Sequence, residues 1–264
     1  MPCIGAARAR RRVVNTSSRA TRSIVVLKIG GSVLTNLESY ADAARFVAER
    51  HEHEPDAAFV VVVSAQHGET DALLATANTL ATRPDPAIVD LLWSTGELRS
   101  VALLTLALQA RGVRATGANV HESGLVTGER FGGRPSLHAM KLRALLAGHD
   151  VVVVPGFLAR GPGDRVVSLG RGGSDLTAVI VAATLGAARC ELIKDVAGYY
   201  AADPKVDPAA DHLPALDYER SLAMADAGCG LVQRAALETA HAHGLPMVVR
   251  SMAATHATVL STRS

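Results

Sequence analysis

The sequence predicts an α/β fold with a largely parallel central sheet covered by helices. Short runs of β-branched residues alternate with longer stretches whose apolar residues recur at helical spacing. Several of these runs end in a polar or glycine-rich loop that leads into a helix, as repeated β-loop-α units do. Aromatic residues make up only 3% of the chain, so Val, Leu, Ile and Ala must fill the core. Such a core is typical of parallel strands buried on both faces.

The predicted elements alternate along the chain. Buried strands are expected at 24–27, 59–63, 114–116, 151–157, 166–168 and 190–193, with a last strand at 246–251. Helices are expected at 41–50, from 72 onward, and at 101–109, 137–146, 176–185, 218–225 and 235–243. The Gly-rich region 119–136 is expected to form a hairpin or a flap, and 158–165 a loop or hairpin. No internal repeat or long linker interrupts this order, so we expect one domain over 23–264.

The first 22 residues differ in charge from the rest of the chain. They hold six of the 27 Lys and Arg residues and none of the 25 acids, which leaves a net charge of −4 on the remainder. We expect residues 1–22 to be a basic, disordered tail, although an Arg-rich and acid-free segment also matches a transit peptide. Because the basic excess lies in this tail rather than on a patterned face, nucleic acid is not an expected partner.

Cysteines and hydropathy narrow the cellular context. Cys3, Cys190 and Cys229 are too few and too scattered for a disulfide framework or a zinc site. We find no apolar run approaching the roughly 20 residues of a membrane span. A cytoplasmic protein with reduced thiols and no membrane partner is therefore expected.

The segment 169–175, Leu-Gly-Arg-Gly-Gly-Ser-Asp, is a candidate anion-binding loop. It joins an expected strand to an expected helix, so backbone N–H groups at the helix N-terminus would face a ligand. Arg171 adds a planar donor fork that suits a carboxylate or a phosphate. Ser174 and Asp175 are candidates for a cap, a ligand or a charge-orienting group. A glycine loop that caps a helix for purely structural reasons is the alternative.

Two further loops carry candidate residues. Lys28, Gly30, Gly31 and Ser32 follow the first strand and combine an ammonium group with bare backbone, an arrangement suited to a transferring phosphoryl group. A surface lysine before a Gly-Gly turn is the alternative. Glu97 follows Ser94-Thr95-Gly96 and is expected near the first turn of a helix, where capping and ligand binding are both open. The pair His121-Glu122 is not expected to bind a metal, because adjacent strand residues point to opposite faces.

With 28–32, 94–97, 169–175 and 195–204 present in this order, the chain resembles the amino acid kinase family, and within it the catalytic domain of the aspartate kinase branch. The resemblance covers roughly 24–251. It implies a three-layer αβα sandwich with a mainly parallel central sheet. The phosphoryl acceptor would bind over the N-terminal half and ATP over the C-terminal half.

The resemblance also implies roles for individual residues. Lys28 would neutralise the transferring phosphoryl group, with Gly30, Gly31 and Ser32 beside it. On the acceptor side, Ser64 and Thr70 would contact the substrate, Glu97 would pair with its amino group, and Arg171 would bind its carboxylate. Ser174 and Asp175 would order the site. The nucleotide-binding segment would hold Lys194, Asp195, Gly198, Tyr200, Asp203 and Lys205.

The chemistry of a carboxylate acceptor agrees with this assignment. A carboxylate with a reference pKa near 4 is already ionised at neutral pH, so its phosphorylation needs no general base. Positioning and charge cancellation suffice, and Mg²⁺ carried on the ATP phosphates would contribute to the latter. We expect no metal held by protein ligands alone. The resemblance further implies a homodimer.

Some positions depart from the family pattern. The C-terminal regulatory domains usual in the aspartate kinase branch are not expected, because the chain ends after the last catalytic strand. Residues 228–234 read Gly-Cys-Gly-Leu-Val-Gln-Arg where the family has a lysine near the ATP phosphates. Lys194 stands where the family has threonine, and Ala197 replaces an aspartate. Lys194 or Arg234 would then supply the missing charge.

Three functions remain open at this stage. The first is an ATP-dependent kinase that makes an acyl phosphate from the side chain of L-aspartate. The second is the same chemistry on another small acid in a specialised pathway. The third is a non-catalytic nucleotide- or anion-binding protein with the same fold.

Overall fold

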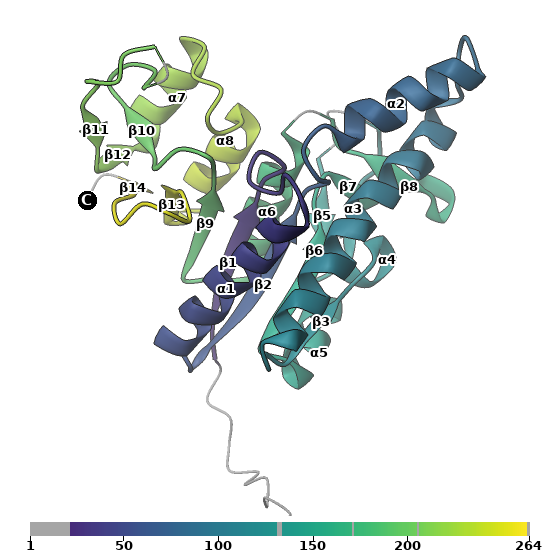
Figure 1. Cartoon of the computed structure of the whole chain (residues 1–264), viewed down its shortest axis with the longest axis horizontal. Coiled ribbons are helices and arrows are strands. Elements are labelled where there is room, and N and C mark those ends of the chain that lie inside the picture. The colour runs from purple at the N-terminus through teal and green to yellow at the C-terminus, as the bar shows by residue number, and fades with distance from the viewer. Residues whose placement is uncertain (1–21, 131–133, 171, 205, 263–264) are drawn as a thin grey trace, which may run out of the picture.

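An eight-stranded sheet lies at the centre of the computed structural model, which describes residues 22–130, 134–170, 172–204 and 206–262. Its strand order is β12-β14-β13-β9-β1-β2-β6-β3 (Figure 1). The strands are β1 (Ser23–Ile29), β2 (Ala57–Val63), β3 (Ala115–Gly117), β6 (Val151–Pro155), β9 (Arg189–Ile193), β12 (Ala215–Asp217), β13 (Met247–Arg250) and β14 (Thr258–Ser261). The six strands from β13 to β3 are parallel, and β14 pairs antiparallel with β13. The mainly parallel sheet is confirmed.

Helices cover both faces of this sheet, which confirms the three-layer sandwich. The residues of β2 alternate between the two layers: Phe59, Val61 and Val63 pack with α1 and α3, whereas Val60 and Val62 pack with α5, α6 and α8. The helices are α1 (Leu37–His53), α2 (Glu69–Leu80), α3 (Pro86–Ala110), α4 (Val120–Ser123), α5 (Ala139–Gly148), α6 (Gly173–Leu185), α7 (Tyr218–Asp226) and α8 (Arg234–Ala242).

Two small sheets complete the architecture. One has the strand order β5-β4-β7-β8 and the other pairs β10 with β11. Their strands are β4 (Leu125–Val126), β5 (Ser136–Leu137), β7 (Leu158–Arg160), β8 (Val166–Ser168), β10 (Tyr199–Tyr200) and β11 (His212–Leu213), and a 3-10 turn, η1 (Pro162–Asp164), joins β7 to β8. The hairpin expected over 158–165 is thus formed by β7 and β8.

The C-terminal end of the sheet differs from the sequence expectation. The strand expected at 246–251 is not the last one, because β14 follows it and returns antiparallel beside it. Thr258 and Leu260 of β14 point into the core and alternate with exposed neighbours. Four residues of this alternation are too few to stand out from a surrounding loop. The strand expected to reach residue 157 ends at Pro155, where the chain turns into the segment before β7.

Helix α3 corrects the expectation about apolar runs. It spans 25 residues and is long and apolar enough to cross a membrane by length and composition alone. The same helix buries Val101, Leu104 and Leu108 against the sheet and carries the buried acids Asp90 and Glu97. A core helix that covers a sheet passes the same length and hydropathy test, so α3 is weak evidence for a membrane span.

Arg22 marks the start of the described chain. Its guanidinium lies 2.7 Å from Asp150 Oδ1 and donates to the carbonyl oxygens of Leu146 and His149 at the end of α5. The sequence assigned Arg22 to the tail, but these contacts fasten it to the folded part. The other residues of that tail, 1–21, lie outside the described residues.

Candidate functional site

Chemically active side chains gather where the parallel strands of the sheet end. Lys28 is the next-to-last residue of β1, Ser64 follows β2, and Lys194 follows β9. The N-terminus of α6 brings Asp175 to the same edge. Because parallel strands carry their carboxyl ends to one edge, residues far apart in sequence meet there, and this edge is where open α/β sheets bind ligands.

Lys28, Asp175 and Lys194 form one buried group, here called the lysine cluster. Lys28 Nζ lies 2.9 Å from Asp175 Oδ1, and Lys194 Nζ lies 2.8 Å from Asp175 Oδ2. The three side chains are only 8%, 13% and 5% exposed for Lys28, Lys194 and Asp175. One carboxylate therefore bridges two ammonium groups in an environment that excludes most water.

Burial and charge act against each other in this cluster. Burial alone would raise the pKa of Asp175, but the two ammonium groups overcome it and hold that pKa below the ordinary value. Burial and the neighbouring Lys28 lower the pKa of Lys194, although the Asp175 carboxylate opposes them. Asp175 is thus an ionised bridge, and the cluster carries more positive than negative charge while Lys194 is protonated.

The loop after β1 needs glycine for close packing. A Cβ atom on Gly30 would lie 2.9 Å from Lys28 Nζ, and one on Gly31 would lie 2.8 Å from the carbonyl oxygen of Ala65. The contact at Gly31 is with backbone and leaves no room for a side chain, whereas the contact at Gly30 is with the end of the flexible Lys28 side chain. Bare backbone therefore lies beside the lysine cluster. Ser32, the last residue of the motif, lines the larger of the pockets described below.

The loop before α6 confirms part of the sequence interpretation. Gly172 has a φ of +71° and is the N-cap of α6, and no side chain caps this helix end. The helix begins at Gly173, earlier than expected, so Ser174 and Asp175 lie in its first turn and neither serves as the cap. Ser174 packs so closely on Gly156 that a Cβ there would lie 2.6 Å from the serine. Arg171, the predicted carboxylate ligand, lies outside the described residues.

Glu97 corrects one expectation. It lies in the middle of α3, whose first turn is at Pro86, so the helix dipole does not account for it. The helix continues through Gly96, where a Cβ would lie only 3.3 Å from the side chains of Ala65 and Glu69, so a residue without a side chain fits there. Glu97 is 3% exposed, and its Oε2 atom has no hydrogen-bond partner among the described residues. Burial raises the pKa of Glu97 to about 8, against the lowering effects of the Ala65 backbone N–H and of Lys28.

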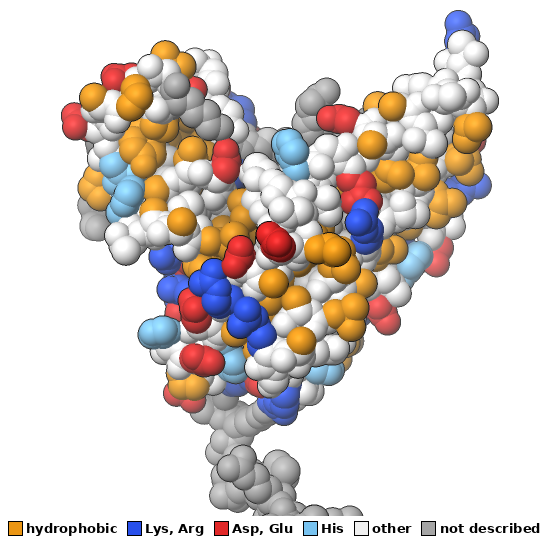
Figure 2. Space-filling view, viewed as in Figure 1, with side chains coloured by type: hydrophobic (Ala, Val, Ile, Leu, Met, Phe, Trp, Pro, Cys, Tyr) orange, Lys and Arg blue, Asp and Glu red, His pale blue; other side chains and the backbone are white. Residues whose placement is uncertain are grey.

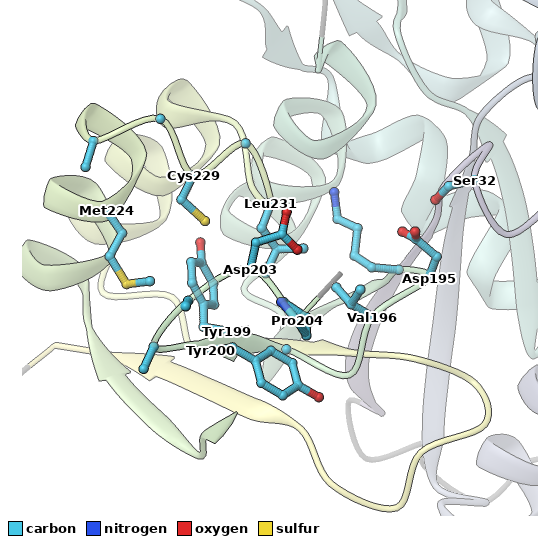
Figure 3. A pocket seen from close by; sticks show the side chains of 17 residues that line it. Ser32, Asp195, Val196, Tyr199, Tyr200, Asp203, Pro204, Met224, Cys229 and Leu231 are labelled. Atoms are coloured by element: carbon cyan, nitrogen blue, oxygen red, sulfur yellow. The ribbon is translucent and has the colours of Figure 1, made fainter. Parts of the chain in front are cut away.

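The larger pocket has a volume of about 760 Å³ and lies between β9 and α7, in the hollow beside the C-terminal part of the fold (Figures 2 and 3). Ser32 and Asp195 lie at one end, whereas Met224 and Cys229 lie at the other. Its size is within the usual range for a cofactor or nucleotide. Among the predicted nucleotide-binding residues, the pocket is lined by Ser32, Lys194, Asp195, Gly198, Tyr200 and Asp203. Lys205, which was also predicted, lies outside the described residues.

A second pocket of about 540 Å³ adjoins the first. Its lining includes the whole lysine cluster together with Ser64 and Ser174. Lys194, Cys229 and Gly230 line both pockets, so the two share a wall at the lysine cluster. Thr70 and Glu97 do not line these two pockets, and Thr70 instead accepts a hydrogen bond on its carbonyl oxygen from Trp93 Nε1 at 3.0 Å.

Sequence reasoning missed several residues beside the site. Phe157 has a φ of +65°, unusual for a bulky residue, and its ring meets Trp93 edge to face at 5.6 Å. Gln233 crowds Gly172, where a Cβ would lie 2.7 Å from its side chain. Glu69 pairs with Arg99 at 2.9 Å and packs against Gly96. The Pro-Gly pair before Phe157 indicated only a strand end. Gln233 lies in the segment 228–234 that departs from the family pattern, but no role was predicted for it, and none was predicted for Glu69.

Metal binding at this site depends on the His, Cys, Asp and Glu side chains that could act as ligands. In the described parts of the chain, no group of three or more His, Cys, Asp or Glu side chains could hold a metal ion. The Asp175 carboxylate already bridges two lysines. Glu122 lies in the short helix α4, not in a strand, and forms a capping box with Asn119. A Mg²⁺ ion fits this site only if nucleotide phosphates supply most of its ligands.

Comparison with known proteins identifies the family. Residues 23–251 match the model of the amino acid kinase family. The chain belongs to this family. It is 38% identical over 231 residues to an aspartokinase of Thermus thermophilus and 37% identical over 229 residues to one of Pseudomonas aeruginosa. These matches cover 87% and 86% of this chain but only 56% and 55% of those proteins, so the chain spans about half the length of the relatives it matches.

Solved structures agree with this membership. The aspartate kinase of Synechocystis superposes with a TM-score of 0.79 at 31% identity, over 91% of this chain and 40% of that one. Aspartokinase III of E. coli, in complex with aspartate and ADP, superposes with a TM-score of 0.82 at 26% identity, over 91% and 65% of the two chains. This amino acid kinase therefore shares its fold with part of an aspartokinase that was solved in complex with aspartate and ADP.

Proposed function

We propose that this amino acid kinase transfers the γ-phosphoryl group of ATP to the side-chain carboxylate of L-aspartate, giving an acyl phosphate and ADP. The observation that carries the proposal is the lysine cluster, which lines the smaller pocket and reaches the larger one through Lys194. Buried ammonium groups beside bare backbone suit a reaction whose transition state is stabilised by charge and position.

We propose that the two pockets bind different parts of the reacting complex. The larger one suits the nucleotide, which Ser32, Gly198, Tyr200 and Asp203 would contact. The smaller one, with Ser64, Ser174 and Lys28, suits the phosphoryl group and the acceptor. Gly30 and Gly31 would bring backbone to the phosphoryl group, and Asp195 would border the phosphates. In this scheme Asp175 orients Lys28 and stays ionised.

Glu97, Thr70 and Arg171 are the residues that we propose to bind the acceptor. Glu97 has a buried oxygen without a hydrogen-bond partner among the described residues, which suits an amino group of the substrate. Thr70 follows Glu69 at the start of α2, near Gly96, and would complete this side. Arg171 and Lys205 keep their proposed roles toward the substrate carboxylate and the nucleotide.

Mg²⁺, cellular location and assembly complete the proposal. A Mg²⁺ ion bound to the ATP phosphates would cancel part of their charge. We also propose that the protein acts in the cytoplasm as a homodimer, in line with its family membership.

A trapping assay tests this function. Purified full-length protein is incubated with Mg-ATP, hydroxylamine and one acid at a time from a panel that includes L-aspartate, L-glutamate and N-acetylated amino acids. We expect hydroxamate from aspartate, and Lys28→Ala should reduce its rate by about 100-fold to 1000-fold. Hydroxamate from another acid only would contradict aspartate as the acceptor. ATP binding without turnover on any acid would contradict the kinase activity.

A further inference from the structure

Lys194 occupies a position that Lys28 does not share. Both ammonium groups contact Asp175, but through different carboxylate oxygens, so they lie on opposite sides of the carboxylate. Lys28 lines only the smaller pocket, whereas Lys194 lines both. The second ammonium therefore faces the nucleotide pocket as well as the phosphoryl-transfer region.

Asp195 as well as Asp175 acts electrostatically on Lys194, so neighbouring acids balance part of the charge of the lysine cluster. Two ammonium groups share the single carboxylate of Asp175, and each lysine side chain is at most 13% exposed. Glu97 is the other acid that acts electrostatically on Lys28, and its raised pKa of about 8 keeps most of it neutral at pH 7. A buried excess of positive charge is costly without a counter-ion. Lys194 is buried and lines both pockets, so its ammonium group is placed to contact an anion bound in the nucleotide pocket.

Arg234 is neither buried nor part of the lining of both pockets, as Lys194 is. Its side chain is 50% exposed, and its guanidinium pairs with Asp226 and, at 2.9 Å, with Glu238. It contributes to the rim of the smaller pocket but is absent from the lining of the larger one. A cation that is hydrated and paired on both sides has little excess charge to offer a phosphate.

We propose that Lys194 binds the β-phosphate side of the nucleotide and stabilises the leaving ADP, while Lys28 stabilises the transferring phosphoryl group. This inference rests on the proposed function. In the transfer step, a bond forms between an acceptor carboxylate oxygen and the γ-phosphorus. The bond from that phosphorus to the β-γ bridging oxygen breaks, and its electron pair remains on ADP. No proton moves, so two fixed cations on either side of Asp175 supply the charge compensation.

Nucleotide binding tests this role without any acceptor. Binding of ADP and of AMP, each with MgCl₂, is measured by calorimetry for the full-length wild type and for Lys194→Met. We expect the substitution to weaken ADP binding by about 10-fold to 100-fold, because a charge-assisted contact is lost. AMP, which has no β-phosphate, should bind both proteins equally. Lys194→Gln keeps a hydrogen-bond donor for Asp175 and should give the same result.

Three matched variants provide the controls. Lys141→Met removes an exposed lysine whose Nζ donates to the carbonyl oxygen of His121, and should leave both affinities unchanged. Lys28→Met should reduce hydroxamate formation far more than it reduces ADP affinity. Arg234→Ala should leave ADP affinity unchanged.

Three results would overturn the inference. One is wild-type ADP affinity in both Lys194→Met and Lys194→Gln. Another is an equal loss of ADP and AMP affinity in either variant. The third is a larger loss of ADP affinity in Arg234→Ala than in Lys194→Met. Since ADP binding needs no acceptor, failure of every acid to react would refute the proposed kinase activity but leave the assignment of the β-phosphate contact to Lys194 intact.

Discussion

Two charged clusters lie along strand β9, and they differ in how far their cations reach water. The arginine cluster consists of Arg50, Glu54, Arg189, Glu191 and Arg250 and lies on the α1 side of the sheet. Its arginine side chains are 20–24% exposed. The lysine cluster follows the end of the same strand, and its two lysines are 8% and 13% exposed.

Both clusters hold one cation more than they hold acids, but the excess has different consequences. Glu191 is 1% exposed and lies within ion-pair distance of all three arginines, with Arg189 Nε at 2.7 Å. The side chain of each arginine stays partly exposed, so water and salt screen the excess positive charge of the arginine cluster. The lysine cluster has less water and faces two pockets, so its excess charge is available to a ligand.

The largest expected effect comes from removing the bridge of the lysine cluster. Asp175→Asn leaves two buried ammonium groups without their carboxylate and should lower the free energy of unfolding by about 3 to 5 kcal/mol. Saturating Mg-ADP should restore part of this loss, because nucleotide phosphates replace the missing negative charge. Urea unfolding with and without nucleotide measures both effects. A loss below about 1 kcal/mol would show that the cluster does not hold an ionised bridge.

The matching substitution in the arginine cluster should cost less. Glu191→Gln keeps the shape of the side chain, and the arginines retain their contact with water. We expect a loss of about 1 to 2 kcal/mol in the same unfolding experiment. Mg-ADP should stabilise this variant by the same amount as the wild type. A loss equal to that of Asp175→Asn would contradict the distinction drawn between the two clusters.

An effect of intermediate size is expected on kcat/KM, and it depends on pH through the titration of Glu97. In the empty protein its pKa is raised to about 8, so the carboxyl group is mostly protonated below that pH. Pairing with a substrate ammonium needs the carboxylate, so kcat/KM for aspartate should rise, by at most about tenfold per pH unit, and level off above about pH 8. The assay is run from about pH 6 to about pH 9. Glu97→Gln should give a low and flat profile, and a flat wild-type profile would contradict the proposed pairing.

The raised pKa of Glu97 makes the free energy of unfolding fall with pH, whereas it makes the predicted activity rise with pH. The pKa of Glu97 is raised on folding, so the folded state holds a proton that the unfolded state releases between about pH 4.5 and about pH 8. Without substrate, the contribution of Glu97 to stability therefore falls as pH rises through this window. Glu97→Gln should lack this component in urea unfolding at several pH values, measured against the wild type.

The smallest effect is expected at Arg234. Its ion pairs with Asp226 and Glu238 lie at the surface, where solvent and salt screen them. Arg234→Ala should leave the midpoint of urea unfolding unchanged within error. A marked shift of that midpoint would mean that exposed arginines also matter to this fold, and would weaken the contrast between hydrated and buried cations.

Much of the fold and part of the site were predictable because they depend on local patterns. The apolar runs predicted the positions of β1, β2, β6 and β9, since strands buried on both faces are mostly apolar. The glycines of the loops after β1 and before α6 marked backbone that approaches other groups closely. The short strand β14 was missed, because four residues carry little periodicity. Helix α3 was cut short, because only its part at 101–109 was expected to be helical.

The sequence by itself determined the β-loop-α order, most of the strands that build the sheet and the presence of Lys28, Asp175 and Lys194 near its ends. Only the tertiary structure decided how these charges are shared. It placed both lysines on one carboxylate, buried Glu97 in the middle of a helix and left Arg234 at the surface. The physical reason is that burial and ion pairing depend on residues 19 to 147 positions apart in the chain, such as Lys194 with Asp175 and Lys28 with Asp175, which meet only after the parallel strands align.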